Sequence, residues 1–215
     1  MLTLFAHPFS SYSQKVLIAL YENATPFAFR MLGPEHPQNG AELMRLWPRA
    51  SFPLLLDDDV PVLESSTIIE HLQIRHPGPV RLIPDGAAAL KARMLDRIFD
   101  NHVMAPVQRV VGDALRPAER RDPVAVEEAK AALDQAYGWL DPRLKEDWAA
   151  GDFSLADCAA APALFYADWV HPIGERFAAL RGYRARLLAR PSFARAVDEA
   201  RPYRPLFPLG APERD

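Results

Sequence analysis

The sequence has little cysteine, no excess of positive charge and no long hydrophobic run. Its 215 residues include one cysteine, Cys158, which excludes an internal disulfide, a Cys-x-x-Cys pair and a structural zinc finger. Lys and Arg number 25 against 28 Asp and Glu, so no positive field is present to attract a nucleic acid. No run of about 18 apolar residues occurs, and residues 1–20 lack a signal-peptide pattern. We therefore expect a cytoplasmic protein without nucleic-acid or membrane partners.

Glycine is also scarce, whereas proline is abundant, with 10 and 21 residues respectively. Average usage would give roughly 15 and 11. Hydrophobic residues make up 49% of the chain and charged residues 25%, which excludes a disordered or collagen-like protein. At roughly 150 residues per domain, the length falls between one large domain and two small ones.

Up to about residue 77, short apolar runs alternate with amphipathic stretches, which is typical of an α/β domain. The predicted strands are 1–6, 26–32, 53–56 and 60–63. The first predicted helix follows the loop 7–11, the second occupies 41–46 and the third begins at 64. Residues 34–40 are expected to be a loop. The last two strands form a hairpin across three aspartates, so the four strands should make a mixed sheet.

Beyond a linker at 78–86 no further strand is predicted. One long helix is expected over 87–115, bent at Pro106 because proline lacks the backbone donor and clashes one turn back. Another helix is predicted to begin at 123. The next begins at Ser154, where Asp157 completes a capping box, and two more helices are predicted over 175–189 and 193–201. The predicted domains are therefore an α/β domain at 1–77, an all-helical domain at 87–201 and an extended proline-rich tail at 202–215.

Hydroxyl side chains cluster at residues 10–13, where the first strand turns into the first helix. Free N–H groups and the helix dipole stabilise an anion at such a position. A serine hydroxyl there can donate a hydrogen bond to a thiolate. Ordinary N-capping by Ser10 or Ser11 is the alternative interpretation.

Two further segments suggest peptide binding. A cis bond between Phe52 and Pro53 would turn the Phe52 backbone outward to pair with an extended peptide, although most X–Pro bonds are trans. Glu64 and Ser65 begin another helix, where Glu64 can hold an ammonium group and Ser65 a carboxylate. Taken alone, this pair is equally typical of helix capping.

In this order the segments resemble the glutathione transferase superfamily, in particular its serine-type bacterial cytosolic members, over essentially the whole chain. The family pattern Asn-Pro-x-Gly-Lys-Val-Pro, followed by Glu-Ser-x-x-Ile, is similar to residues 47–53 and 64–68. The helical-domain pattern Gly-Asp-x-x-Ser/Thr-x-Ala-Asp is similar to residues 151–157, with one residue fewer. The junction at 190–193 also resembles that of the family's penultimate helix.

The resemblance implies a thioredoxin-like first domain and a homodimer that adds glutathione, as cosubstrate, to a small-molecule electrophile, as in detoxification. It implies that Pro53 is cis, that Phe52 pairs with the cysteine backbone of glutathione, and that Glu64 and Ser65 hold the γ-glutamyl end. Ser10 lies six residues before Val16, where serine-type members carry the residue that activates the thiol. Ser11 and Tyr12 remain alternatives.

This chain departs from the family pattern beside the proline. Ser51, assigned to the glutathione site, stands where many relatives carry Lys or Gln, and Ala50 replaces glycine. The glycine carboxylate of glutathione is therefore expected to be held more weakly, or from around Gln38 and Asn39. The first loop carries no Cys-Pro pattern, which argues against thiol–disulfide exchange.

The second substrate is expected between the domains, against Phe9 and one face of the long helix that carries Arg93, Arg97, Asn101, Met104 and Gln108. No metal is expected, since His7 near the proposed thiol has no second histidine or carboxylate beside it. Cys158, flanked by alanines, is predicted to be a small core residue.

Two other functions stay open. The first is a glutathione-dependent isomerase, because residues 10–13 are similar to the Ser-Ser-Cys-Ser stretch of zeta-class maleylacetoacetate isomerases. The cysteine of that stretch is missing here, which weakens this alternative. A non-catalytic interaction module that keeps the transferase fold is the other alternative.

Overall fold

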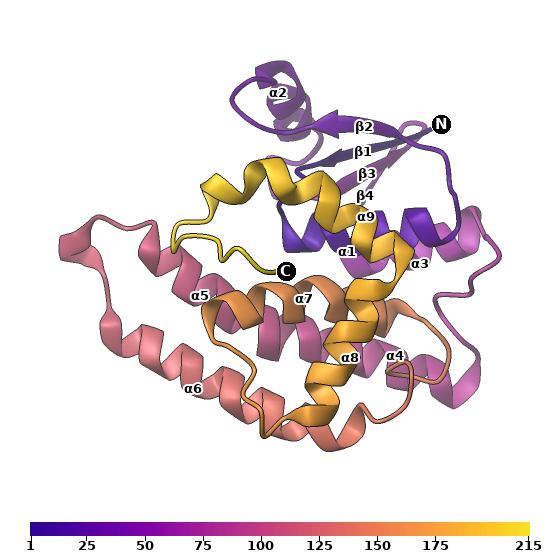
Figure 1. Cartoon of the computed structure of the whole chain (residues 1–215). Coiled ribbons are helices and arrows are strands. Elements are labelled where there is room, and N and C mark those ends of the chain that lie inside the picture. The colour runs from indigo at the N-terminus through magenta and orange to yellow at the C-terminus, as the bar shows by residue number, and fades with distance from the viewer.

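A four-stranded sheet organises the first part of the chain in the computed structural model, which describes all 215 residues (Figure 1). Its strands are β1 (Leu2–Ala6), β2 (Ala28–Met31), β3 (Leu54–Asp57) and β4 (Val60–Leu63), in the order β2-β1-β3-β4. β1 and β2 are parallel, and the β1–β3 and β3–β4 pairs are antiparallel. The predicted mixed, thioredoxin-like sheet is confirmed.

Three helices accompany this sheet: α1 (Ser11–Glu22), α2 (Pro37–Leu46) and α3 (Ser65–Arg75). α2 begins four residues before the predicted position 41, so the expected loop over 34–40 was partly wrong. Pro37 lies in the first turn of α2, where no backbone donor is needed, and therefore starts the helix instead of preventing it.

The rest of the chain is mostly helical, as predicted. Its α-helices are α4 (Gly86–Ile98), α5 (Ala105–Ala114), α6 (Pro123–Leu140), α7 (Leu155–Val170), α8 (Ala178–Ala189) and α9 (Pro191–Ala200). Short 3-10 turns occur at Ala118–Arg120 and Asp141–Arg143.

The long helix predicted over 87–115 is not one regular helix. A π-helical segment, Phe99–Met104, separates α4 from α5. Pro106 lies in the first turn of α5, directly after the π-helical segment, where a missing backbone N–H is tolerated. The π-helix changes which side chains share a face, so the single face predicted for this long helix does not form as such.

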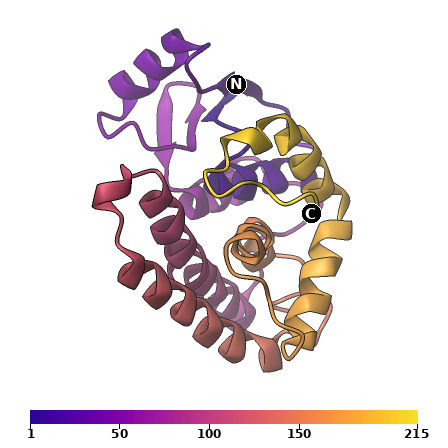
Figure 2. The same cartoon turned by 60° about the vertical axis from the view of Figure 1, so that its left-hand side comes forward.

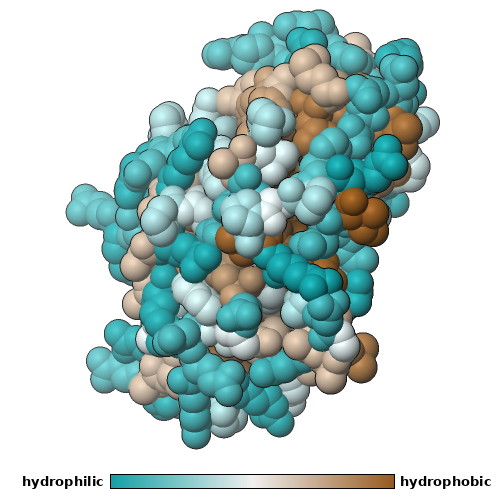
Figure 3. Space-filling view, turned by 90° about the vertical axis from the view of Figure 1, so that its right-hand side faces the viewer, coloured by the Kyte–Doolittle hydropathy of each residue, from teal (hydrophilic) through white to brown (hydrophobic).

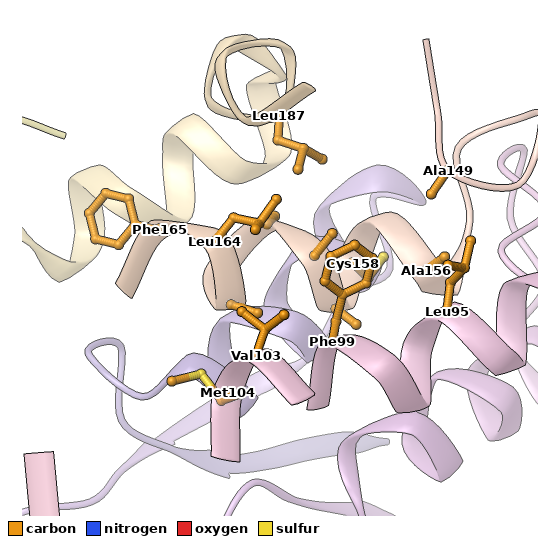
Figure 4. Close-up of a cluster of buried hydrophobic side chains, with 14 of the residues drawn as sticks. Leu95, Phe99, Val103, Met104, Ala149, Ala156, Cys158, Leu164, Phe165 and Leu187 are labelled. Atoms are coloured by element: carbon orange, nitrogen blue, oxygen red, sulfur yellow. The ribbon is translucent and has the colours of Figure 1, made fainter. Parts of the chain in front are cut away.

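α7 is the centre of the helical domain, and Figure 2 shows it in orange, end-on, with the other helices around it. All but one of its 16 residues are buried. Cys158 and Leu164 of α7 pack against Phe99 and Val103 (Figure 4). Cys158 is fully buried, and this burial raises the pKa of its thiol, so the prediction of a core residue is confirmed.

The C-terminal segment corrects the prediction of an extended tail. Arg201–Leu206 forms a 3-10 helix, and Phe207 beyond it is buried. The carboxylate of Asp215 pairs with Arg201 at 2.5 Å and also with Arg204, which folds the tail back onto the protein. Prolines fit the 3-10 helix because it demands few backbone donors.

None of the helices is both long and apolar enough to cross a membrane. The side of the molecule that lies on the right in Figure 1 is largely hydrophilic, with hydrophobic side chains interspersed (Figure 3).

Asp157 joins the start of α7 to two other segments, as the predicted capping box requires. Its carboxylate accepts hydrogen bonds from the backbone N–H of Ser154 at 2.9 Å and of Ala149 at 2.9 Å. The buried Tyr183 hydroxyl donates a third bond at 2.5 Å. One side chain therefore satisfies donors from three separate parts of the helical domain.

We predict that Asp157→Ala lowers the free energy of unfolding by at least about 3 kcal/mol, since it removes a cap and leaves buried donors without partners. Asp152→Ala, at an exposed position five residues earlier, should change it by less than about 0.5 kcal/mol. Urea denaturation of both variants tests this, and equal losses would contradict the assigned role.

Candidate active site at the domain junction

A polar pocket of about 410 Å³ lies where the two domains meet. This volume is within the range of roughly 300–1,000 Å³ usual for small-molecule sites. The sheet domain supplies Tyr12, Ser51, Phe52, Pro53, Glu64, Ser65 and Ser66, and the helical domain supplies Arg97, Asp100 and Asn101. Five residues assigned to glutathione binding from the sequence, Ser51, Phe52, Pro53, Glu64 and Ser65, thus line one cavity.

Phe52 exposes an unused stretch of backbone in this pocket. The Phe52–Pro53 peptide bond is cis, as the resemblance implied. Neither the N–H nor the C=O of Phe52 forms a hydrogen bond within the chain, and 39% of the residue is exposed. An extended peptide can pair with this donor and acceptor in the manner of an added strand.

The N-terminus of α3 opens into the same pocket. Glu64 occupies the N-cap position with φ of 65°, a conformation that is unusual for a residue other than glycine and is concentrated at functional sites. Its side chain does not cap the helix. Ordinary capping is therefore excluded for Glu64, and the first N–H groups of α3 are available to a carboxylate.

The loop before Pro53 holds a cation that the sequence reasoning missed. Arg49 and Trp47 line the pocket, and the Trp47 indole N–H donates to Ser51 Oγ at 2.7 Å. The alternative source of contacts, around Gln38 and Asn39, does not line it. The Asn39 amide instead donates to the Met31 carbonyl at 2.7 Å. Arg49 lies within residues 47–53, which resemble the family pattern, and its charge was the available signal.

The three candidate hydroxyls at the start of α1 have different surroundings. Ser10 is the N-cap residue, and its Oγ accepts a long hydrogen bond of 3.4 Å from the Ser13 N–H, so its own proton remains free to donate. The Ser11 Oγ is buried without a partner. Burial raises the pKa of Tyr12 to about 12, with contributions from Asp100 and Glu64, so the phenol stays protonated.

A smaller apolar pocket of about 280 Å³ adjoins the polar one. Phe52 lines both pockets, and Ser10, Ser11 and Phe9 line the apolar one. Its remaining walls come from the helical domain and the C-terminal segment and include Met104, Val107, Gln108, Tyr166, Leu206 and Phe207. The hydroxyl cluster therefore lies beside a cavity suited to an apolar molecule.

The predicted single face for the second substrate is divided between the two pockets. Met104 and Gln108 line the apolar pocket, whereas Arg97 and Asn101 line the polar one. Arg93 lines neither and pairs with Glu70 at 2.7 Å. The π-helix causes this division, because its wider turns break the spacing of three or four residues on which the prediction rested.

The loop before α1 is held from the helical domain by Tyr166. The Tyr166 hydroxyl donates to the Phe9 carbonyl at 2.9 Å and accepts from the Gln14 amide at 3.2 Å. The same amide donates to the Pro8 carbonyl at 3.0 Å. Within the loop, His7 Nδ1 accepts from the Phe9 N–H at 3.1 Å, and burial lowers the pKa of His7, which favours the neutral ring.

Lys15 forms a buried ion cluster beneath the polar pocket. Its ammonium lies 2.5 Å from the Asp96 carboxylate, 2.7 Å from that of Asp100 and 2.8 Å from Ser66 Oγ. Arg97 covers the cluster and pairs with both aspartates. The Lys15 side chain is only 1% exposed, and burial raises the pKa of Asp100 although Lys15 opposes this. The cluster joins α1 and α3 to the helical domain.

These features define a class of protein: a thioredoxin-like domain followed by an all-helical domain, with the cis-proline site between them. A family model of the glutathione S-transferase N-terminal domain matches residues 4–80, and a model of its C-terminal domain matches residues 100–191. The chain belongs to the glutathione S-transferase superfamily.

The individual relatives carry different names. The chain is 30% identical to a probable maleylacetoacetate isomerase of Vibrio cholerae, over 94% of this chain and 97% of that protein. It is 28% identical to a stringent starvation protein A homolog of Coxiella burnetii, over 93% of each. A glutathione S-transferase structure from Methylobacterium radiotolerans, in complex with glutathione sulfonate, is 29% identical with a TM-score of 0.78, covering 91% of this chain and 94% of that one.

We predict that Lys15→Met lowers the free energy of unfolding by about 3–5 kcal/mol, because two buried carboxylates lose their cation. Neutralising Asp96 and Asp100 to asparagine in the same protein should recover part of this loss. Lys91→Met, at an exposed position in α4, is the matched control and should be nearly neutral. A Lys15→Met protein as stable as the control would show that the cluster does not hold the domains together.

Proposed function

We propose that this protein is a glutathione transferase that adds the glutathione thiolate to an electrophilic carbon of a small molecule. The observation that carries the proposal is the unpaired backbone of Phe52, a residue that lines both the polar pocket and the apolar one. Glutathione is an extended peptide with charged ends and a central thiol, which matches this combination.

The charged groups of the polar pocket support an orientation for glutathione. Glu64 binds the γ-glutamyl ammonium group, and the γ-glutamyl carboxylate accepts hydrogen bonds from Ser65 and the free N–H groups of α3. Phe52, held by Pro53, pairs with the cysteine backbone. Ser51 and Arg49 then lie on the side of the glycine carboxylate.

The thiol needs activation, because free cysteine has a pKa near 8.5 and is only a few per cent thiolate near pH 7. In the proposed mechanism the Ser10 hydroxyl donates a hydrogen bond to the sulfur, and the N-terminus of α1 adds its dipole. The thiol proton leaves to solvent, and the thiolate forms a C–S bond with the electrophile in the apolar pocket. The electrophile then expels its leaving group or, where it is an activated double bond, takes up a proton from water. Ser10 stays neutral throughout, unlike a general base.

We also propose a cytoplasmic homodimer. A groove of about 510 Å³ between the α4–α5 stretch and α6 is lined largely by small and apolar side chains, among them Ala105, Ala129, Ala132 and Trp139. Nearby on α4, Leu90 and Met94 are exposed. Light scattering should give twice the 24.1 kDa mass of the chain, and a monomer mass would refute the dimer.

Two relatives keep the alternative functions open. The identity to a probable maleylacetoacetate isomerase favours glutathione-dependent isomerisation, in which the sulfur adds and later leaves. The similarity to stringent starvation protein A homologs, whose name identifies no reaction, favours an interaction module.

We predict that Ser10→Ala lowers kcat about 8- to 25-fold near pH 7, because a rise of the thiol pKa by about 1–2 units, back to its free value near 8.5, cuts the thiolate fraction to about 3%. The dissociation constant for glutathione should change less than about threefold. Steady-state conjugation kinetics and calorimetry measure the two quantities. Ser10→Thr, which keeps both hydroxyl and cap, should retain most activity.

Ser11→Ala and Tyr12→Phe are the comparison variants, and both should keep most of the turnover. If either of them loses turnover while Ser10→Ala does not, the assignment of Ser10 is wrong and moves to that residue.

Binding and turnover together distinguish the three functions. We expect the protein to be retained on immobilised glutathione and to conjugate at least one member of an electrophile panel. Isomerisation of a cis-enone diacid without conjugation would favour the isomerase. Binding without any turnover would favour the interaction module, and failure to bind glutathione would refute the proposed function.

A further inference from the structure

Asp57, His71 and His76 form a cluster that glutathione chemistry does not use. Asp57 Oδ2 lies 2.8 Å from the Nε2 atom of His71 and 2.8 Å from that of His76. One possible ligand atom from each side chain lies within 4.8 Å of the other two. Two imidazoles and one carboxylate therefore converge on one small volume.

The fold sets this cluster apart from the proposed active site. Asp57 ends β3, and His76 follows the last residue of α3. At the opposite ends of these two elements, Pro53 directly precedes β3 and Ser65 begins α3. The 11 residues of α3 alone rise about 16 Å. Asp57 lies opposite Leu2 in the register of β1 and β3, so the cluster lies at the end of the sheet nearest the N-terminus in Figure 1.

We propose that these three side chains bind a divalent transition-metal ion, Zn²⁺ in particular, through two imidazole nitrogens and one carboxylate oxygen. Imidazole and carboxylate are among the usual zinc ligands. Each neutral imidazole offers the Nε2 lone pair and carries its single proton on Nδ1. Because the ligands come from a strand end and a helix end, the ion joins α3 to the β3–β4 hairpin.

The two distances from the Asp57 carboxylate to the imidazoles fit such an ion after a small movement. Tetrahedral zinc with bonds of about 2.0–2.1 Å places its ligand atoms about 3.3 Å apart. The two 2.8 Å separations therefore need to open by about 0.5 Å, which rotation of the imidazole rings can supply. The side chains are 11%, 20% and 34% exposed for Asp57, His71 and His76, so solvent reaches the cluster and a water molecule can take the fourth position.

The alternative is a purely structural trio in which Asp57 accepts a hydrogen bond from each histidine. The two interpretations differ in what an added metal does. A built metal site binds one ion and is stabilised by it, whereas a hydrogen-bonded trio has no measurable affinity.

The test is calorimetric titration of the untagged full chain, free of glutathione and chelators, with ZnCl₂. We expect one ion per chain with micromolar or tighter affinity, and a rise in melting temperature. Asp57→Asn, His71→Gln and His76→Gln should each weaken binding at least about tenfold. His102→Gln, the same change at an exposed histidine outside the cluster, should bind like the unmodified protein.

A cobalt titration keeps the test decisive if a variant misfolds, since it needs only the unmodified chain. Intense visible absorption from four-coordinate Co²⁺, abolished by one equivalent of Zn²⁺, is expected. Absence of zinc binding, weak six-coordinate cobalt absorption only, or folded cluster variants that bind zinc unchanged would each overturn the proposal. Glutathione retention is measured on the same samples, so failure of the metal site is distinguishable from failure of the transferase function.

Discussion

The buried ammonium group of Lys15 is the contact on which the joint between the two domains depends. A cation in a nearly dry environment is tolerated only if anions surround it, and here Asp96 and Asp100 come from the helical domain while Ser66 comes from α3. The requirement to satisfy these charges fixes how the domains meet. Since Ser66, Arg97 and Asp100 also line the polar pocket, the same contacts that join the domains set the shape of the proposed glutathione site.

At this domain junction the polar and the apolar pocket also share one wall. Phe52, whose backbone N–H and C=O have no partner within the chain, lines both pockets. Tyr166 reaches from α7 to hold the loop that carries the hydroxyl cluster against this wall. A peptide cosubstrate bound on one side would therefore carry its sulfur to the edge of the space for an apolar partner, which is the geometry that transfer requires.

Local signals in the sequence predicted much of this. The β3–β4 hairpin, the capping box at Ser154 and the Glu64–Ser65 helix start depend on residues close together in the chain, and all are present. The π-helix at Phe99–Met104 was missed because its sequence resembles ordinary helix. The partners of Lys15 were missed because Asp100 is 85 positions away. Docking of Phe207 depends on a surface that exists only after folding. The cluster of Asp57, His71 and His76 also forms only on folding, which is why the sequence led us to expect no metal.

The central claim is that the protein lowers the pKa of the thiol of bound glutathione. The most direct measurement is a pH titration of the ultraviolet thiolate absorbance of glutathione bound to the unmodified protein. The account predicts an apparent pKa about 1–2 units below the value near 8.5 of a free cysteine thiol. A bound thiol that titrates like free glutathione would contradict it.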